Sequence, residues 1–144
     1  MAVTARFYNK FFDLVLTSAA VNLESDAIKA AVVTSAYTPD YDAHDYWDDV
    51  SIHEAEADDY VAGGVALTSV AVSIDAPNDE IEIDAADVED EWTPASPTGR
   101  YVIIYDSTVG AGLLICCQDL GDNVSLSGLT FNAEGFAKID TNPA

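Results

Sequence analysis

The sequence predicts a mainly β protein: an antiparallel β-sandwich or jelly roll of about eight strands with one N-terminal helix. Two observations support this class. Short apolar or alternating segments recur between turn signals about every 8–12 residues, which is typical of antiparallel sandwiches. No helical periodicity lies between these segments, so the crossover helices of a parallel sheet are not expected. The length predicts a single domain over residues 1–144.

The first predicted element is a helix over residues 4–18, with Thr4 as its N-cap. Its aromatic residues recur at helical spacing. Two roles fit the segment 1–20: a helix that covers an open end or edge of the sheet, or a docking arm for a neighbouring subunit. In the second role the interface residues are Phe7, Phe11 and Phe12.

Predicted strands begin at residue 28. Uninterrupted apolar runs indicate central strands that are buried on both faces, whereas strict alternation indicates a strand with one face in water. The run over 65–74 changes phase at Thr68 and Ser69, which indicates a β-bulge. A turn is expected over 132–135. The predicted strands are 28–33, 65–74, 80–84, 101–105, 113–117, 129–131 and 136–139, and two short segments, 50–52 and 88–92, are candidates for further strands.

The chain is strongly acidic, with 26 Asp and Glu, 5 Lys and Arg, and a formal net charge of -21. Hydrophobic residues make up 49%, so a core can form and the acids are expected outside it. Nucleic acid and anionic membranes are excluded as partners, because both require clustered basic residues. Molar salt, where the Debye length is about 3 Å, would tolerate this charge. The scarcity of basic residues therefore favours a halophilic protein.

Residues 40–59 are predicted to form an acidic surface loop, and residues 75–91 a second acidic region. Asp40, Asp42 and Asp45 alternate within the loop and could supply oxygen ligands to Ca²⁺, although the glycine and bidentate Glu of an EF-hand are missing. The alternative is a solvated loop with only Ca²⁺, Mg²⁺, Na⁺ or K⁺ counterions. No cofactor is expected.

Signals of catalysis, secretion or membrane insertion are not found in the sequence. His44 and His53 lack the spacing of a metal or catalytic motif, and no nucleophile elbow or phosphate loop occurs. The adjacent Cys116 and Cys117 should point to opposite faces of a strand, so no disulfide is expected. We therefore expect neither enzymatic activity nor a signal peptide, and the given sequence contains no apolar run of about 18 residues.

Six short segments occur in an order that is specific as a set. They are IKAAVVTSAYTPD (28–40), YVAGG (60–64), AADV (85–88), RYVIIYD (100–106), LLI (113–115) and DLG (119–121). This ordered set, which covers about residues 28–136, resembles a family of small structural proteins of tailed double-stranded DNA viruses. Two departures are Asp58-Asp59, where small residues are usual, and Gly112, where proline is common.

The resemblance implies a virion component without a catalytic role. We expect a capsid decoration or turret protein of a virus that infects a halophilic archaeon. It would form a homo-oligomer and bind other virion proteins, above all the major capsid protein. A tail or neck protein of the same virion is one alternative, because the family does not separate head from tail. A Ca²⁺-dependent extracellular binding module is another, with ligands Asp40, Asp42 and Asp45.

Overall fold

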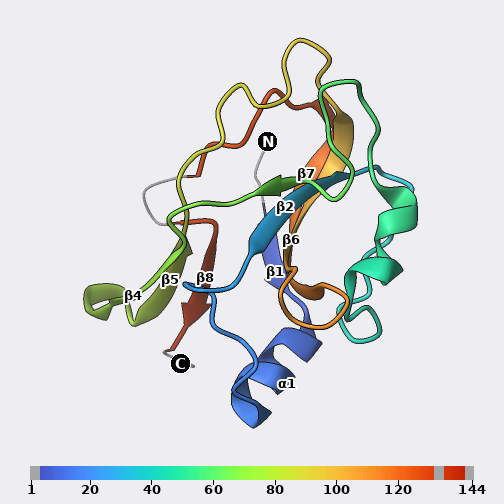
Figure 1. Cartoon of the computed structure of the whole chain (residues 1–144). Helices are drawn as coiled ribbons and strands as arrows, with labels where there is room; N and C mark the ends of the chain where they lie inside the picture. Colours follow the sequence, from blue (N-terminus) through green and yellow to red (C-terminus); the bar gives the residue numbers. More distant parts are fainter. Residues whose placement is uncertain (1–3, 132–134, 142–144) are drawn as a thin grey trace.

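The computed structural model describes residues 4–131 and 135–141 and contains two antiparallel sheets packed in a sandwich-like arrangement (Figure 1). The larger sheet has the strand order β1-β7-β6-β2-β3 and the smaller one β4-β5-β8. The predicted mainly β class is confirmed. Of the turn expected over 132–135, residues 132–134 lie outside the described residues. The elements are β1 (Thr4–Phe7), α1 (Asn9–Thr17), β2 (Ile28–Val33), η1 (Trp47–Asp49), η2 (Ser51–His53), β3 (Val65–Ala66), β4 (Ala71–Asp75), η3 (Ala76–Asn78), β5 (Glu80–Asp84), β6 (Thr98–Asp106), β7 (Leu113–Ser125) and β8 (Ala137–Asp140).

The centre of the larger sheet is formed by β6 and β7, whose apolar residues are buried on both faces. Ile103 is in register with Cys117, and Ile104 with Cys116. Because neighbouring side chains point to opposite faces, Ile104 and Cys116 join the core between the sheets, while Ile103 and Cys117 join a second core behind them. The cysteines thus lie on opposite faces as predicted, and both are buried free thiols.

The second core is closed by the acidic segment 34–62, most of which lies on the side of the larger sheet opposite the smaller sheet (Figure 1). Ala55 and Tyr60, near the end of the segment, pack instead into the core between the sheets. Tyr37, Tyr41 and Val50 pack inward, and Trp47 stacks on Tyr105 with ring centroids 4.6 Å apart. The acidic side chains of 40–59 are exposed or half-buried. We call 34–62 the covering segment, because it closes a face of the sheet as well as presenting acids to solvent.

The strand predicted at 50–52 is wrong, because the covering segment forms the short 3-10 helices η1 and η2 at this point. Val50 donates its N–H to the carbonyl of Trp47, and His53 donates to Val50, at 3.0 and 2.9 Å. These local bonds satisfy the backbone without a neighbouring strand. A single inward-facing residue, Val50, therefore gives an apolar signal that resembles a short strand.

The first described residues form a strand and not the start of a helix. β1 pairs antiparallel with β7, placing Phe7 opposite Cys116, and α1 begins only at Asn9. The predicted helix start at residue 4, with Thr4 as N-cap, is therefore wrong. The physical reason is that β1 satisfies backbone groups along one side of β7, a long-range contact that local helical spacing cannot reveal.

The segment predicted as one strand over 65–74 forms two strands in different sheets. β3 pairs with β2, and β4 pairs with β5. Between them Ser69 has φ of 54°, in the left-handed region, where the chain changes direction. The phase change at Thr68 and Ser69 therefore marks the passage between sheets rather than a bulge.

The strands predicted at 88–92 and 129–131 are reduced to one bridge. Val88 and Leu129 exchange two backbone hydrogen bonds, of 2.7 and 2.6 Å. The remaining predicted strands coincide with β2, β5, β6, β7 and β8, of which β6 and β7 extend further than expected. Within the described ranges, no helix is long and apolar enough to cross a membrane.

Candidate functional site

Asp40 and Asp42, two of the predicted cation ligands, each serve a local contact. Asp40 Oδ1 accepts the backbone N–H groups of Ala43 and Asp42 at 3.0 and 3.1 Å, and these bonds lower the pKa of Asp40. Asp42 Oδ1 accepts a hydrogen bond from the side-chain amide of Asn9, the first residue of α1. Asp40 therefore holds a turn, and Asp42 ties the covering segment to the helix.

Asp45, the third predicted ligand, is paired with Asp49. Desolvation, followed by the neighbouring Asp49 carboxyl, raises the pKa of Asp45, whereas backbone N–H groups of Asp45 and Tyr46 donate to Asp49 and lower its pKa. Among the described residues, the three predicted ligands do not gather their carboxylate oxygens within 4.8 Å of one another. The cation site in the loop 40–59 thus stays a prediction without a converging ligand set.

The aromatic residues predicted as an interface form one cluster. Phe7 contacts Phe11 and Phe12, with ring centroids 5.8 and 4.9 Å apart. Phe11 is only 3% exposed and belongs to the core between the sheets, while Phe7 and Phe12 are half-buried against it. Two apolar side chains of α1 are exposed to solvent, namely Val15 and Leu16.

Both histidines contact the same tyrosine in the covering segment. Tyr37 Oη lies 2.9 Å from His44 Nδ1, and the ring centroid of His53 lies 6.0 Å from that of Tyr37. Tyr37 Oη is also 2.8 Å from the hydroxyl of the buried Tyr8. The structure therefore places both histidines against Tyr37, through the packing of the covering segment on the larger sheet.

Three carboxylates not singled out by sequence reasoning come together on the smaller sheet. Asp75, Glu80 and Glu82 each offer an oxygen within 4.8 Å of the others. The register of β4 and β5 places Asp75 opposite Glu80, while Glu82 follows on the same face. Lys138 on β8 pairs with Glu80, with Nζ 3.2 Å from Oε2. A hard cation would therefore compete with a lysine already in place.

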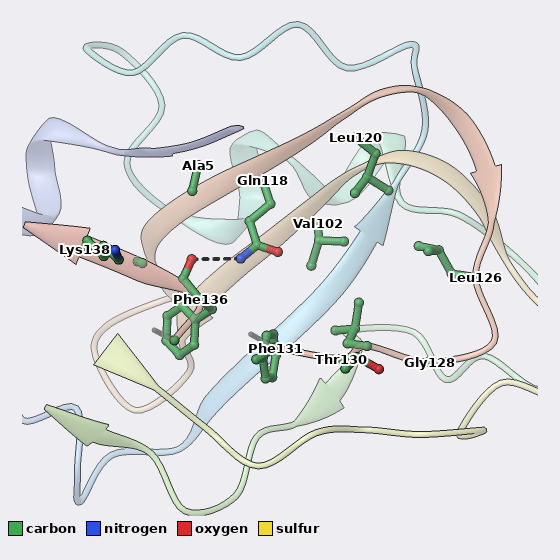
Figure 2. Close-up of a pocket in the computed structure, with 13 residues that line it drawn as sticks. Ala5, Val102, Gln118, Leu120, Leu126, Gly128, Thr130, Phe131, Phe136 and Lys138 are labelled. Carbon is green, nitrogen blue, oxygen red and sulfur yellow. Dashed lines mark hydrogen bonds between the residues drawn. The ribbon is translucent and has the colours of Figure 1, made fainter. Parts of the chain in front are cut away.

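A cleft of about 530 Å³ lies between the larger sheet and residues 126–131 and 135–138 (Figure 2). Its floor is a row of side chains across three strands: Ala5 on β1 is in register with Gln118 on β7, which is in register with Val102 on β6. The exposed Ala5 stands at one edge of this row. The opposite wall is formed by Leu126, Gly128, Leu129, Thr130, Phe131 and Phe136.

Gln118 is the principal polar group of this cleft and is only 9% exposed. Its Nε2 donates to the backbone carbonyl of Phe136 at 3.0 Å, which joins the floor to the wall (Figure 2). A carbonyl oxygen can only accept, so the amide nitrogen must face Phe136. The side-chain carbonyl Oε1 is then turned toward the interior of the cleft, beside Val102 (Figure 2).

A second buried polar group, Asp106, ends β6. It is 0% exposed; its Oδ1 accepts the N–H of Thr108 at 3.0 Å, and its Oδ2 has no hydrogen-bond partner among the described residues. Burial, assisted by the neighbouring Asp26 carboxyl, raises the pKa of Asp106 to about 7. In the sequence, Asp106 and Gln118 are marked only as polar residues that end apolar runs.

Comparisons with known proteins add no relative to this description. The chain matches no protein-family model, no curated protein and no solved structure. The family resemblance therefore rests on the six ordered segments alone. Several of these segments form the centre of the larger sheet, where β2, β6 and β7 pair.

Proposed function

We propose that the protein is a non-enzymatic structural protein of a tailed virus adapted to high salt, and that it decorates the capsid or forms its turrets. The proposal combines the ordered segments of residues 28–136 with a surface that is strongly acidic yet carries exposed apolar side chains. The observation that carries it is the edge strand β4, which offers an apolar surface for assembly.

β4 forms one edge of the smaller sheet, and four of its five residues are exposed. Val72 and Ile74 point to the same face of the strand and are 42% and 82% exposed. An edge strand with apolar side chains is the type of surface that pairs with another chain. Glu24 Oε2 accepts the N–H of Val72 at 3.1 Å, so one acidic side chain covers part of this edge.

The helix α1 supplies a second apolar contact, consistent with its predicted role as a docking arm. Leu16 is 82% exposed and Val15 44%. Phe11 fills the core of its own chain, so Leu16 and Val15 are better placed than Phe11 to enter a partner's pocket as hot-spot residues do. Phe7 on β1 packs against Phe11 and Phe12 of the helix.

The acidic surface is compatible with assembly in brine. Molar salt reduces the Debye length to about 3 Å, so like charges on neighbouring copies repel only at short range. In the proposed particle the protein forms a homo-oligomer around a symmetry axis and docks on the major capsid protein. Its acidic residues at 40–59 and 75–91 face solvent.

The assembly surface is tested by sedimentation of the purified protein in molar KCl. Ile74→Asp should shift the oligomer toward the monomer, because it places a charge in the apolar contact. Ser73→Asp is the matched control, since it adds the same charge to the opposite face of β4. If Ile74→Asp and wild type sediment equally, β4 does not form the contact between subunits.

Location is tested by cryo-electron microscopy and protein quantification of purified particles. The proposal expects many copies on the capsid shell, at a fixed ratio to the major capsid protein. Density at the neck or tail would favour the alternative assignment as a tail or neck protein. Absence of the chain from particles would overturn the structural role.

A further inference from the structure

We propose that the cleft between the larger sheet and residues 126–131 and 135–138 binds a small, uncharged aromatic molecule that carries one N–H or O–H donor. Three features support this: the size of the cleft, its largely apolar lining and the fixed acceptor on Gln118. The inference goes beyond the virion role, and neither depends on the other.

The cleft has the dimensions and lining of a ligand site. Its volume of about 530 Å³ falls within the range of about 300–1,000 Å³ found for small-molecule pockets. Among the described residues that line it, Lys138 is the one with a charge, and this ammonium is paired with Glu80 at 3.2 Å. An ionised ligand would lose hydration without gaining an opposite charge, so an uncharged occupant is favoured.

The aromatic wall favours a flat ligand. Phe131 and Phe136 lie with ring centroids 5.6 Å apart at an angle of 56°, and both line the cleft. Tilted rings of this kind present faces and edges that an additional aromatic ring can contact. Val102 and Leu126 supply aliphatic contacts from the floor and the opposite wall (Figure 2).

Gln118 adds the specificity. Its bond to Phe136 fixes the amide, and Oε1 faces the cleft beside Val102. A ligand donor would satisfy this acceptor, whereas a ligand of the same shape without a donor would cover it and leave it unpaired. The site should therefore distinguish two molecules that differ only in one donor.

Indole and 1-methylindole are the probes, because they share one bicyclic ring system and only indole has an N–H. Ligand-observed NMR titration in molar KCl measures both dissociation constants. Indole should bind saturably at about 10 mM or below, the range that ligand efficiencies give for a molecule of this size. It should bind about three- to tenfold more tightly than 1-methylindole, because only indole forms the hydrogen bond.

Two variants and a matched control locate the site. Ala5→Phe should abolish indole binding by filling the edge of the cleft, whereas Ala66→Phe should leave it unchanged. Ala5 and Ala66 are both exposed alanines, on the opposite edge strands β1 and β3 of one sheet. Gln118→Met should remove the preference for indole over 1-methylindole.

The proposal would be overturned by absence of saturable indole binding to the wild type, or by equal binding to Ala5→Phe and Ala66→Phe. Equal affinity of the wild type for the two probes would show that Gln118 does not recognise the ligand and that the ligand needs no hydrogen-bond donor. Ala5 lies at an exposed position, so its variant decides the test even if Gln118→Met does not fold.

Discussion

Replacement of Asp106 by asparagine should stabilise the protein at neutral and alkaline pH. Asp106 is 0% exposed, and its Oδ2 lacks a hydrogen-bond partner among the described residues. Burial and the adjacent Asp26 carboxyl raise its pKa from 3.8 to about 7. Because the folded-state pKa is raised, the stability associated with the protonated form is fully present below about pH 4 and is lost as the pH rises through about 7.

The size of the effect follows from that pKa difference. Each pKa unit corresponds to about 1.4 kcal/mol, so the change from 3.8 to about 7 represents up to roughly 4 kcal/mol of unfolding free energy. Asparagine keeps the shape of the side chain but cannot ionise, and its amide can donate toward Asp26. Asp106→Asn should therefore resemble the wild type near pH 4 and exceed its stability increasingly up to about pH 8.

Urea unfolding followed by tryptophan fluorescence, at constant molar KCl across this pH range, measures the difference. Asp58→Asn is the control, because it removes one exposed carboxylate and changes the net charge equally. If the stability difference between Asp106→Asn and wild type is independent of pH, or matches that of Asp58→Asn, the conclusion that burial raises the pKa of Asp106 is wrong.

Three further predictions concern the charge and the core. In dilute KCl the midpoint of thermal unfolding should fall by at least about 10 °C relative to molar KCl, and an unchanged midpoint would contradict the halophilic interpretation. Phe11→Ala should cost about 3–5 kcal/mol in urea unfolding, and the half-buried Phe12→Ala clearly less; equal losses would argue against the packing of α1. Gly64→Ala should cost at least about 2 kcal/mol, because Gly64 has φ of 87° and the new Cβ would lie 2.1 Å from the carbonyl oxygen of Ala30. If Gly64→Ala unfolds like the wild type, the backbone of Ala30 does not exclude a side chain at position 64.

The central strands could be predicted from sequence because consecutive apolar residues indicate a strand that is buried on both faces. Every residue of β6 from Tyr101 to Asp106 is buried, so the apolar run matches the two-sided environment directly. The N-terminal strand could not be predicted in this way. Residues 4–7 continue the aromatic spacing of α1, and only their pairing with β7 decides their conformation.

The predicted and observed sites differ for the same reason. Local spacing drew attention to Asp40, Asp42 and Asp45. The oxygens of Asp40 and Asp42 are directed to neighbouring backbone and side-chain donors, and the Asp45 carboxyl lies beside that of Asp49. The polar groups that the fold isolates are Asp106 and Gln118, and the neighbours of Gln118 come from strands and loops far apart in the chain. Register across β1, β7 and β6, rather than spacing, creates the cleft.

The adjacent cysteines make this chain a built-in reporter of its own partial unfolding. Cys116 faces the smaller sheet and Cys117 faces the covering segment, and burial raises the pKa of Cys117 to about 12. A thiol reagent can therefore modify each sulfur only after the layer above it has moved away. Relative labelling rates at two neighbouring positions would thus show which layer detaches first, without any introduced probe.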